Sequence, residues 1–316
     1  MKAIMFGRYG TPDVLRLEEI ERPVPKNGEI LIRVRAASLN AYDLHCLSGT
    51  PILIRLMGAG LLRPTPKPAG ADMAGTVEAI GPGVGEFKPG DEVYGCRRGS
   101  LAEYACGPAD KFAPKPSNLS FEEAAAVPMA GLTALQGLRD KGKIQKGQSV
   151  LINGAAGGVG SFAVQLAKMF GTEVTAVCRT DKMDFVRSLG ADAVVDYTRE
   201  DITKSGRTFD LILDMAAYRS VLKYRRILKP GGTYVLVAGS TASTLQLAPV
   251  SKIVDRNMVM MLAKVERGDL LALKEYSEAG RIRPFVDRIY PLNESAAAFW
   301  QLKNGQVRGK VVVAVP

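Results

Sequence analysis

Four glycines follow a short apolar run at the point where the sequence turns from a strand pattern to a helix pattern. The run is Ser149–Asn153, and Gly154, Gly157, Gly158 and Gly160 come directly after it. Glycines at such a turn let a phosphate approach backbone N–H groups, and the start of a helix adds partial positive charge. The G-x-x-G-x-x-G spacing in this context therefore predicts a dinucleotide site. The alternative is a glycine-rich turn that serves only close packing.

The residues after the glycines repeat with the period of an amphipathic helix. Apolar side chains recur at Val159, Phe162, Ala163, Leu166, Ala167 and Phe170. They share one helix face, and Gly171 is expected to end the helix. The turn thus joins a buried strand to a helix that packs on it. The residues expected to contact the cofactor here are Gly154, Ala156, Gly157, Gly158 and Val159.

The end of the next strand, Glu173–Cys178, indicates which dinucleotide binds. A site for NAD carries Asp or Glu at this position to bind the adenosine ribose. Here Arg179 follows the strand and Lys182 lies close behind. Each charge-assisted hydrogen bond to a 2′-phosphate contributes about 1.5–3 kcal/mol, so these cations predict NADPH. A solvated surface pair is the alternative, and Asp181 is explained as an acid in the first turn of a helix capped by Thr180.

The surrounding elements predict an α/β fold. Short β-branched strands alternate with helical stretches from Ser149 to about Ala263, which is typical of a doubly wound parallel sheet. One helical stretch, 218–232, is expected to end at its Pro-Gly-Gly sequence. The first third of the chain is instead rich in strand patterns. Ser120 and Glu123 then form a capping box that starts a helix.

Composition indicates a globular protein of 316 residues that is 47% hydrophobic and 23% charged. The net charge is +10, but the basic residues are scattered, which argues against a nucleic-acid-binding tail. The four cysteines form no C-x-x-C pair, which fits free thiols in a reducing compartment. The first residues include no apolar signal segment. We therefore expect a cytoplasmic protein without a membrane span.

Several motifs together resemble the medium-chain dehydrogenase/reductase superfamily, and within it the zinc-free quinone oxidoreductase (zeta-crystallin-like) branch. They are VLINGAAGGVG, GADAVVDYTRED, LKPGGTYVLVAG, AASLNAYDLHCLSG, KPAGADMAGTVEAIGPGV and the final GKVVV. The resemblance implies a GroES-like catalytic domain from residues 1–122 and 264–316. It implies a Rossmann domain over residues 123–263 and a cleft between the two. It also implies a homodimer joined through the last Rossmann strand, for which the apolar run 257–263 is suitable.

The ligands that the zinc branch needs are missing. The chain has one histidine, His45, and AASLNAYD has no cysteine before Asn40. GADMAG stands where the zinc enzymes carry Gly-His-Glu, so four Cys and His ligands cannot be gathered. We expect no metal. The easier reaction is then hydride delivery to a carbon that is already electrophilic, such as a quinone or the β-carbon of an enone.

The resemblance also assigns candidate catalytic residues. Asn40, Tyr42 and Asp43 belong to an N-x-x-D segment that borders the nicotinamide and the substrate in this family. Tyr42 is a candidate hydrogen-bond donor to a substrate carbonyl, or else a half-buried structural tyrosine. His45 is a candidate proton donor, or else a solvated or structural histidine.

Further residues are expected at the cofactor by resemblance. Thr133 is expected near the nicotinamide end, Tyr197 near the adenine, and Gly239 and Ser240 at the end of a Rossmann strand. Arg308 lies in a tail that is near the cofactor in relatives, although a solvated position explains it equally well. One apolar segment, 48–70, is longer than the family pattern. It is either a lid or pocket wall, or an extra core helix.

The sequence therefore predicts an NADPH-dependent, metal-independent reductase of quinones or α,β-unsaturated carbonyl compounds. Two alternatives stay open at this point. One is a zinc-free NADP-dependent alcohol dehydrogenase, and the other is a non-catalytic NADPH-binding sensor or nucleic-acid-binding protein.

Overall fold

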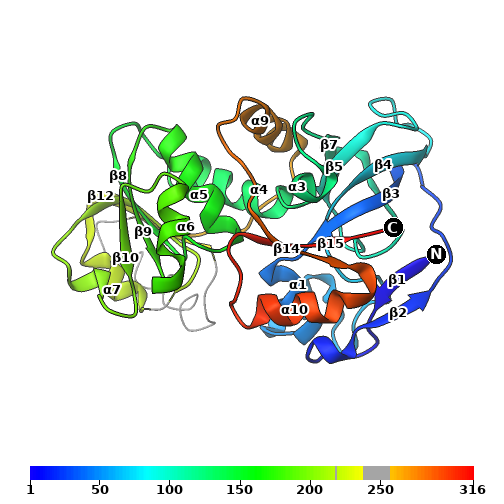
Figure 1. Ribbon diagram of the computed structural model, residues 1–316, viewed down its shortest axis with the longest axis horizontal. Helices are drawn as coiled ribbons and strands as arrows, with labels where there is room; N and C mark the ends of the chain where they lie inside the picture. Colours follow the sequence, from blue (N-terminus) through cyan, green and yellow to red (C-terminus); the bar gives the residue numbers. More distant parts are fainter. Residues whose placement is uncertain (218, 238–256) are drawn as a thin grey trace. The chain divides into compact units, whose positions relative to one another are not determined.

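The chain forms two compact units (Figure 1). The computed structural model describes all residues except 218 and 238–256. The first unit comprises Met1–Met129, Val265–Gly280 and Pro284–Pro316, and the second comprises Ala130–Lys264 and Arg281–Arg283. Both ends of the chain thus belong to the first unit, and the second is an insertion between them.

The second unit is built on a six-stranded parallel sheet with the order β10-β9-β8-β11-β12-β13. Its strands are β8 (Ser149–Asn153), β9 (Glu173–Cys178), β10 (Ala193–Asp196), β11 (Phe209–Asp214), β12 (Leu228–Leu236) and β13 (Asn257–Met260). The chain moves outward from β8 to β10 and then returns to place β11 on the other side of β8. This reversal creates a topological switch point, and ligands bind at the carboxyl ends of the strands there. The predicted doubly wound parallel sheet is confirmed.

The glycine turn joins β8 to α5 (Gly158–Met169) as the sequence predicts. Phe162, Ala163, Leu166 and Ala167 of α5 are fully buried. Gly154 has φ +86°, a left-handed conformation that favours glycine. A Cβ on Gly160 would lie 2.3 Å from the backbone oxygen of Gly154, so this position allows the helix to approach the strand. Close packing therefore requires a glycine at 160, and the backbone conformation favours one at 154.

The helix before β12 is shorter than expected. The pattern over 218–232 predicts a helix that continues to the Pro-Gly-Gly sequence, whereas α7 covers only Val221–Arg225. β12 begins at Leu228, and its pairing with β11 shifts register between Phe209 and Leu211. Pro230 and the two following glycines therefore lie within the irregular part of a strand. Parallel pairing with β11 outweighs the local helix pattern here.

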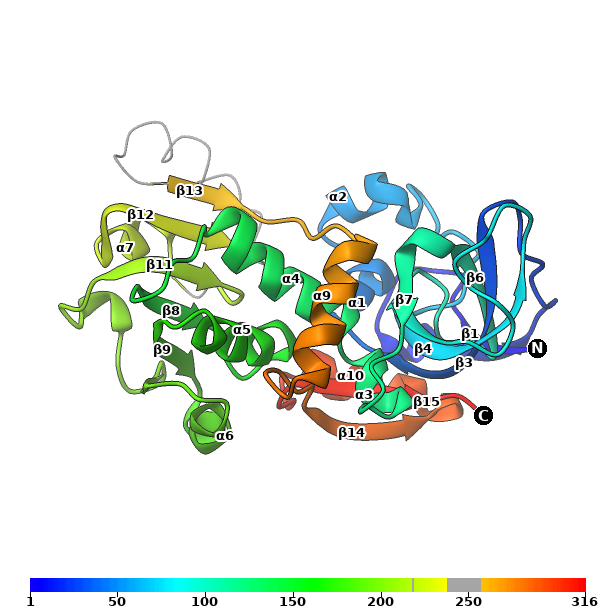
Figure 2. The same cartoon turned by 90° about the horizontal axis from the view of Figure 1, so that it is seen from above.

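The first unit is built on a seven-stranded sheet with the order β14-β15-β3-β4-β5-β7, and β6 pairs with β3 beside this path. Its strands are β3 (Glu29–Ser38), β4 (Asp72–Ile80), β5 (Glu92–Cys96), β6 (Tyr104–Pro108), β7 (Phe112–Pro114), β14 (Val286–Pro291) and β15 (Lys310–Ala314). A hairpin of β1 (Lys2–Met5) and β2 (Arg16–Glu19) precedes them. β15, from the end of the chain, runs antiparallel to β3 with Val312 opposite Ser38 (Figure 2). This pairing places residues from both ends of the sequence side by side.

The first unit also contains short helices. They are α1 (Ala41–Ser48), α2 (Ile52–Ile54), α3 (Phe121–Ala125), α9 (Arg267–Glu278) and α10 (Ser295–Lys303), and α4 (Pro128–Gln136) spans the boundary to the second unit. α3 begins with the predicted capping box, in which the Glu123 N–H donates to Ser120 Oγ at 3.2 Å.

The 48–70 segment forms α2 and a π-helical turn, η2 (Arg55–Ala59). Ile52 and Leu56 are each 66% exposed, and Leu62 is 87% exposed. These three side chains lie outside the core, and both a lid or pocket wall and an extra core helix stay predictions. Among the described residues, no helix combines the length and apolar character needed to cross a bilayer.

Two glycines in the first turns of equally long helices provide a test of the packing at the glycine turn. Gly160→Ala should lower the free energy of unfolding by about 1–3 kcal/mol, because the new Cβ meets backbone atoms that cannot move freely. Gly268→Ala in α9 should be neutral or slightly stabilising, because nothing lies within 4 Å of a Cβ there. Urea unfolding of both variants measures the difference. Equal effects of the two substitutions would contradict the packing argument.

Candidate active site

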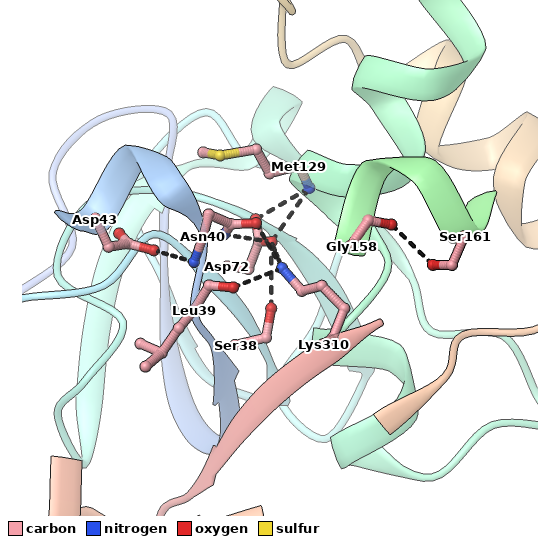
Figure 3. Close-up of polar contacts among 9 residues, drawn as sticks. All are labelled: Ser38, Leu39, Asn40, Asp43, Asp72, Met129, Gly158, Ser161 and Lys310. Carbon is pink, nitrogen blue, oxygen red and sulfur yellow. Dashed lines mark hydrogen bonds and ion pairs between the residues drawn. The ribbon is translucent and has the colours of Figure 1, made fainter. Parts of the chain in front are cut away.

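A buried polar network lies where β3, β4, α1 and β15 of the first unit meet (Figure 3). Asp72, at the start of β4, is fully buried. Its Oδ2 accepts from Asn40 Nδ2 at 2.9 Å and from Ser38 Oγ at 3.3 Å. Its Oδ1 accepts from the backbone N–H of Met129 at 3.1 Å. One carboxylate thus joins three segments that are distant in the sequence.

Lys310, at the start of β15, supplies the positive charge of this network. Its side chain is only 2% exposed, and its Nζ lies 3.5 Å from Asp72 Oδ2. The ammonium donates to the backbone oxygen of Leu39 at 2.9 Å and to Asn40 Oδ1 through a short hydrogen bond. The network therefore contains a buried ion pair with an amide between its two charges.

Burial and pairing act in opposite directions on these two groups. Desolvation raises the pKa of Asp72 and lowers that of Lys310, because it disfavours both charged forms. Their mutual attraction opposes both shifts, as do the hydrogen bonds from Asn40 and Met129 to Asp72. Donors surround the carboxylate and acceptors surround the ammonium. This arrangement favours the ion pair over the neutral pair.

Asp43 is a second buried carboxyl group, one turn into α1. Its Oδ2 accepts from the backbone N–H of Asn40 at 2.8 Å and so caps the helix. Burial raises the pKa of Asp43 to about 7, the charge of Asp72 adds to this rise, and the Asn40 N–H opposes it. Asp43 therefore gains a proton as the pH falls through about 7, and in this form it adds no second negative charge to the buried site.

The three candidate catalytic residues occupy different environments on α1. Asn40 lies in the buried network. Tyr42 is half-buried, and its pKa is raised chiefly by burial, so it keeps its proton and can donate a hydrogen bond. His45 is exposed, and its Nδ1 lies 2.8 Å from the backbone oxygen of Thr50. The structure thus places Asn40 beside Asp72, but it does not bring His45 into this network.

The glycine turn of the second unit presents backbone donors. Ser161 N–H donates to the backbone oxygen of Gly157 at 2.9 Å, which is the first hydrogen bond of α5. The N–H groups of Gly158, Val159 and Gly160 precede it, so the helix itself provides them with no acceptor. Gly158 and Val159 are partly exposed, and Ser161 Oγ donates to the Gly158 oxygen, as Figure 3 shows. The residues present therefore fit a bound diphosphate.

Arg179 does not stand alone at the end of β9. Its Nε and one terminal nitrogen donate to the two carboxylate oxygens of Asp181 at 2.6 and 2.8 Å. Thr180 does not cap the following helix as predicted, because its hydroxyl donates to Asp196 through a short hydrogen bond. Lys182 immediately precedes α6 (Met183–Ser188). The turn thus contains the expected cations, with one already paired to a carboxylate.

A cavity of about 280 Å³ lies at the carboxyl ends of the second unit's strands. Tyr197 lines it, together with Asn153, Asp201, Arg219 and Tyr224. Tyr197 is thus in a hollow on the edge of the sheet where nucleotides bind in this class of fold. This cavity is the candidate site for the adenosine end of the cofactor.

Asp214 connects the glycine turn to the turn after β11. It is fully buried and accepts from Asn153 Nδ2 at 2.7 Å, from the Tyr234 hydroxyl at 2.7 Å and from the Ala217 N–H at 2.8 Å. Burial raises the pKa of Asp214, and these hydrogen bonds oppose the rise. This residue was not identified from the sequence.

The remaining candidate cofactor residues are placed as follows. Thr133 is buried in α4. Arg308 is half-exposed and its Nε lies 3.6 Å from Asp287 Oδ1, while Gly239 and Ser240 lie outside the described residues. Among the residues that the structure describes, no three His, Cys, Asp or Glu side chains are grouped to hold a metal ion.

Two residues of the buried network, Asp72 and Lys310, were missed as site residues. Each is the one charge in a short apolar stretch at the start of a strand, in GADMAG and in GKVVVAV. Lysine and aspartate are almost never fully buried unless they are paired. Opposite charges in two apolar strands were therefore a usable signal for a pair.

Comparison with known proteins identifies the family. Residues 26–117 match the alcohol dehydrogenase GroES-like domain, and residues 189–313 match a family model described as zinc-binding dehydrogenase. A 2-methylene-furan-3-one reductase of Solanum lycopersicum is 36% identical over 99% of this chain and 79% of its own length. The chain belongs to the medium-chain dehydrogenase/reductase superfamily. Within the superfamily it falls in the quinone oxidoreductase branch.

Other members of the superfamily agree with this assignment. An NADPH-dependent alkenal/one oxidoreductase of Arabidopsis thaliana is also 36% identical, over 99% of this chain and 79% of its own length. The solved quinone oxidoreductase of Coxiella burnetii has a TM-score of 0.92 and 32% identity, and the match covers 100% of this chain and 99% of that one. The expected GroES-like and Rossmann architecture is confirmed.

The raised pKa of Asp43 predicts a pH dependence of stability. Between about pH 4 and pH 7 the unfolded chain loses this proton while the folded protein keeps it, so stability falls as pH rises through this window. Asp43→Asn removes the effect and retains an acceptor for the Asn40 N–H. The stability of the variant relative to wild type should rise by up to about 4 kcal/mol from pH 4 to pH 7.5. Urea unfolding at several pH values tests this, and parallel curves for the two proteins would contradict it.

Proposed function

We propose that this protein reduces quinones or α,β-unsaturated carbonyl compounds with a hydride from NADPH and without a metal ion. Two of its relatives are named for the reduction of such compounds, and they cover almost the whole chain. A solved structure that matches its full length is a quinone oxidoreductase. These similarities support the class of reaction and the class of substrate.

One observation carries the metal-independent form of this proposal. The resemblance places GADMAG where the zinc branch carries Gly-His-Glu. Here Asp72 of this segment accepts from Asn40 and lies 3.5 Å from the Lys310 ammonium, which also bonds to Asn40. To bind here, a metal ion would have to displace the buried, hydrogen-bonded ammonium of Lys310 from the carboxylate of Asp72. The groups at this position are therefore committed to an internal charge pair rather than to a metal.

The second unit has the groups needed to hold the cofactor. The N–H groups of Gly158, Val159 and Gly160 would hold the diphosphate, and the cavity beside Tyr197 would take the adenosine end. When bound, the reduced nicotinamide supplies the hydride. The protein's own contribution is binding, orientation and exclusion of water.

NADPH rather than NADH is supported by the turn after β9. No carboxylate ends this strand, and Arg179 and Lys182 follow it. Asp181 opposes this preference, because it already pairs with Arg179 through two hydrogen bonds. A 2′-phosphate must therefore share Arg179 with Asp181 or take it over. The selectivity for NADPH depends on this competition.

Hydride addition leaves an enolate or a hydroquinone anion, which must gain one proton: at the α-carbon of a reduced enone, or at the oxygen of a reduced quinone. Tyr42 keeps its phenolic proton, so it can donate a hydrogen bond to a carbonyl oxygen while negative charge develops there. Water can then supply the proton to the enolate or hydroquinone anion. Asn40 is proposed to orient the nicotinamide or the substrate through its amide, as the family resemblance implies.

Turnover tests the proposed function directly. Loss of NADPH absorbance should be observed with members of a panel of quinones and enones, and treatment with EDTA should leave the rate unchanged. Oxidation of simple alcohols at neutral pH should be much slower. Bound NADPH without turnover on any member of the panel would overturn the proposal, and a chelator-sensitive rate would overturn its metal-independent form.

The competition for Arg179 predicts opposite effects of two substitutions. Arg179→Ala should weaken NADPH binding about tenfold and leave NADH binding nearly unchanged, because only NADPH has the 2′-phosphate. Asp181→Asn should strengthen NADPH binding, because it removes the carboxylate that competes with the 2′-phosphate for Arg179. Arg187→Ala, which removes a similarly exposed arginine that pairs with Asp184, is the control and should change neither affinity. Equal losses for both cofactors in Arg179→Ala would contradict a phosphate site.

Two further expectations belong to this proposal. β13 is the last strand of the second unit's sheet, and Met260 and Leu262 are 38% and 60% exposed, which supports a homodimer through this edge. All four cysteines are free, which supports a reducing compartment such as the cytoplasm.

A further inference from the structure

The amide of Asn40 lies between two buried charges of opposite sign. Its Nδ2 donates to Asp72 Oδ2 at 2.9 Å, and its Oδ1 accepts from Lys310 Nζ. Rotating the amide by 180° would place its NH2 group against the ammonium and its oxygen against the carboxylate. Both contacts would then be repulsive inside a low-dielectric site, where such effects are strong. The ion pair therefore permits only one orientation of this amide.

The ammonium of Lys310 is not available to donate a proton to a ligand. Its three N–H bonds face three acceptors, namely the Leu39 oxygen at 2.9 Å, Asn40 Oδ1, and Asp72 Oδ2 at 3.5 Å. Its side chain is 2% exposed. A direct role as an acid is therefore excluded, and any effect of Lys310 on the reaction must pass through the groups that it holds.

Asp72 is equally fixed from the other side. It accepts from Ser38 Oγ on β3 and from the Met129 N–H on α4, in addition to Asn40. The carboxylate cannot turn away from the amide without breaking these bonds. One N–H bond of Asn40 Nδ2 is used by Asp72, which leaves the second with a fixed direction.

We propose that Lys310 and Asp72 are positioning residues for hydride transfer, which they influence by holding the Asn40 amide in one orientation. This inference rests on the proposed function, in which Asn40 orients the nicotinamide or the substrate. Stability alone does not account for the pair, because a buried ion pair is often no more stabilising than apolar residues of the same volume. Unlike apolar residues, the two charges distinguish the oxygen of the Asn40 amide from its NH2 group.

A double substitution separates positioning from structural support. Lys310→Met or Asp72→Asn alone leaves one buried charge without its partner, so each should lower the melting temperature. Lys310→Met/Asp72→Asn removes both charges together and should recover most of that loss. The kcat of the double variant should nevertheless stay at least tenfold below that of wild type, because both orientations of the Asn40 amide are then accessible.

The role of Asn40 as the intermediary is tested in a second background. Asn40→Ala should itself lower kcat, and adding the double substitution to it should cause no further loss. An equal further loss would show that the pair does not act through Asn40 and would overturn the inference. Recovery of kcat together with the melting temperature in the double variant would also overturn it, because the pair would then be structural only.

The first unit contains a matched control. Lys115 is 7% exposed, lies 3.2 Å from Glu92 and donates to the backbone oxygens of Pro116 and Leu119. Lys115→Met/Glu92→Gln removes a lysine pair away from Asn40 in which the lysine side chain is buried and that of Glu92 is 54% exposed. It should leave kcat within about twofold of wild type.

A readout without turnover distinguishes this inference from the proposed function. With selective ¹⁵N-asparagine labelling, the Nδ2 signal of Asn40 is assigned by its loss in Asn40→Ala. Its hydrogen exchange should be slow in wild type and at least tenfold faster in Lys310→Met/Asp72→Asn. If wild type reduces no substrate, the proposed function fails, while this exchange rate still decides whether the pair orders the amide. Unchanged exchange would overturn the inference even in an active enzyme.

Discussion

The buried pair of Lys310 and Asp72 is the constraint on which the first unit depends. An ammonium and a carboxylate can be buried only when each finds partners for its remaining donors and acceptors, because desolvation of an unpaired ion is costly. Meeting this requirement brings together the end of β3, the starts of β4 and β15, and the first turn of α4. Lys310 and Asn40 are 270 positions apart, so the network also holds the two ends of the chain in one unit.

The proposed role of the second unit sets a different requirement, which is to present backbone donors to an anion. β8 ends at a turn where Gly154 adopts a left-handed conformation and Gly160 allows α5 to approach the strand closely. Asp214 fixes the adjacent turn through hydrogen bonds to Asn153 and to two backbone N–H groups. The binding groups are mainly backbone, and the side chains of this unit hold that backbone in place. The first unit works in the opposite way, because its candidate site consists of side chains on α1 and at the ends of strands.

This contrast between a site made of backbone and a site made of side chains explains which features could be predicted from the sequence. The glycine turn, α5, the strands of the parallel sheet and the capping box of α3 depend on local spacing, and each was predictable. The helix before β12 was predicted too long because parallel pairing with β11 begins at Leu228 and outweighs a local pattern. The environment of Arg179 was also missed in part, because the choice of Asp181 as its partner depends on side-chain geometry. The three α1 candidates were identified by resemblance, which gives no information on burial.

The sequence by itself determined the fold class, the glycine turn between β8 and α5 and the superfamily, because these follow from periodicity and from motifs of neighbouring residues. Only the tertiary structure showed that Asn40, Asp72 and Lys310 form one buried network and that Asp43 lies close enough to share its electrostatics. A strand can pair with any other strand of suitable pattern, so spacing along the chain does not reveal which charges meet. The pairing of β15 with β3 made that choice by placing a lysine from the end of the chain beside an asparagine and an aspartate from its first quarter.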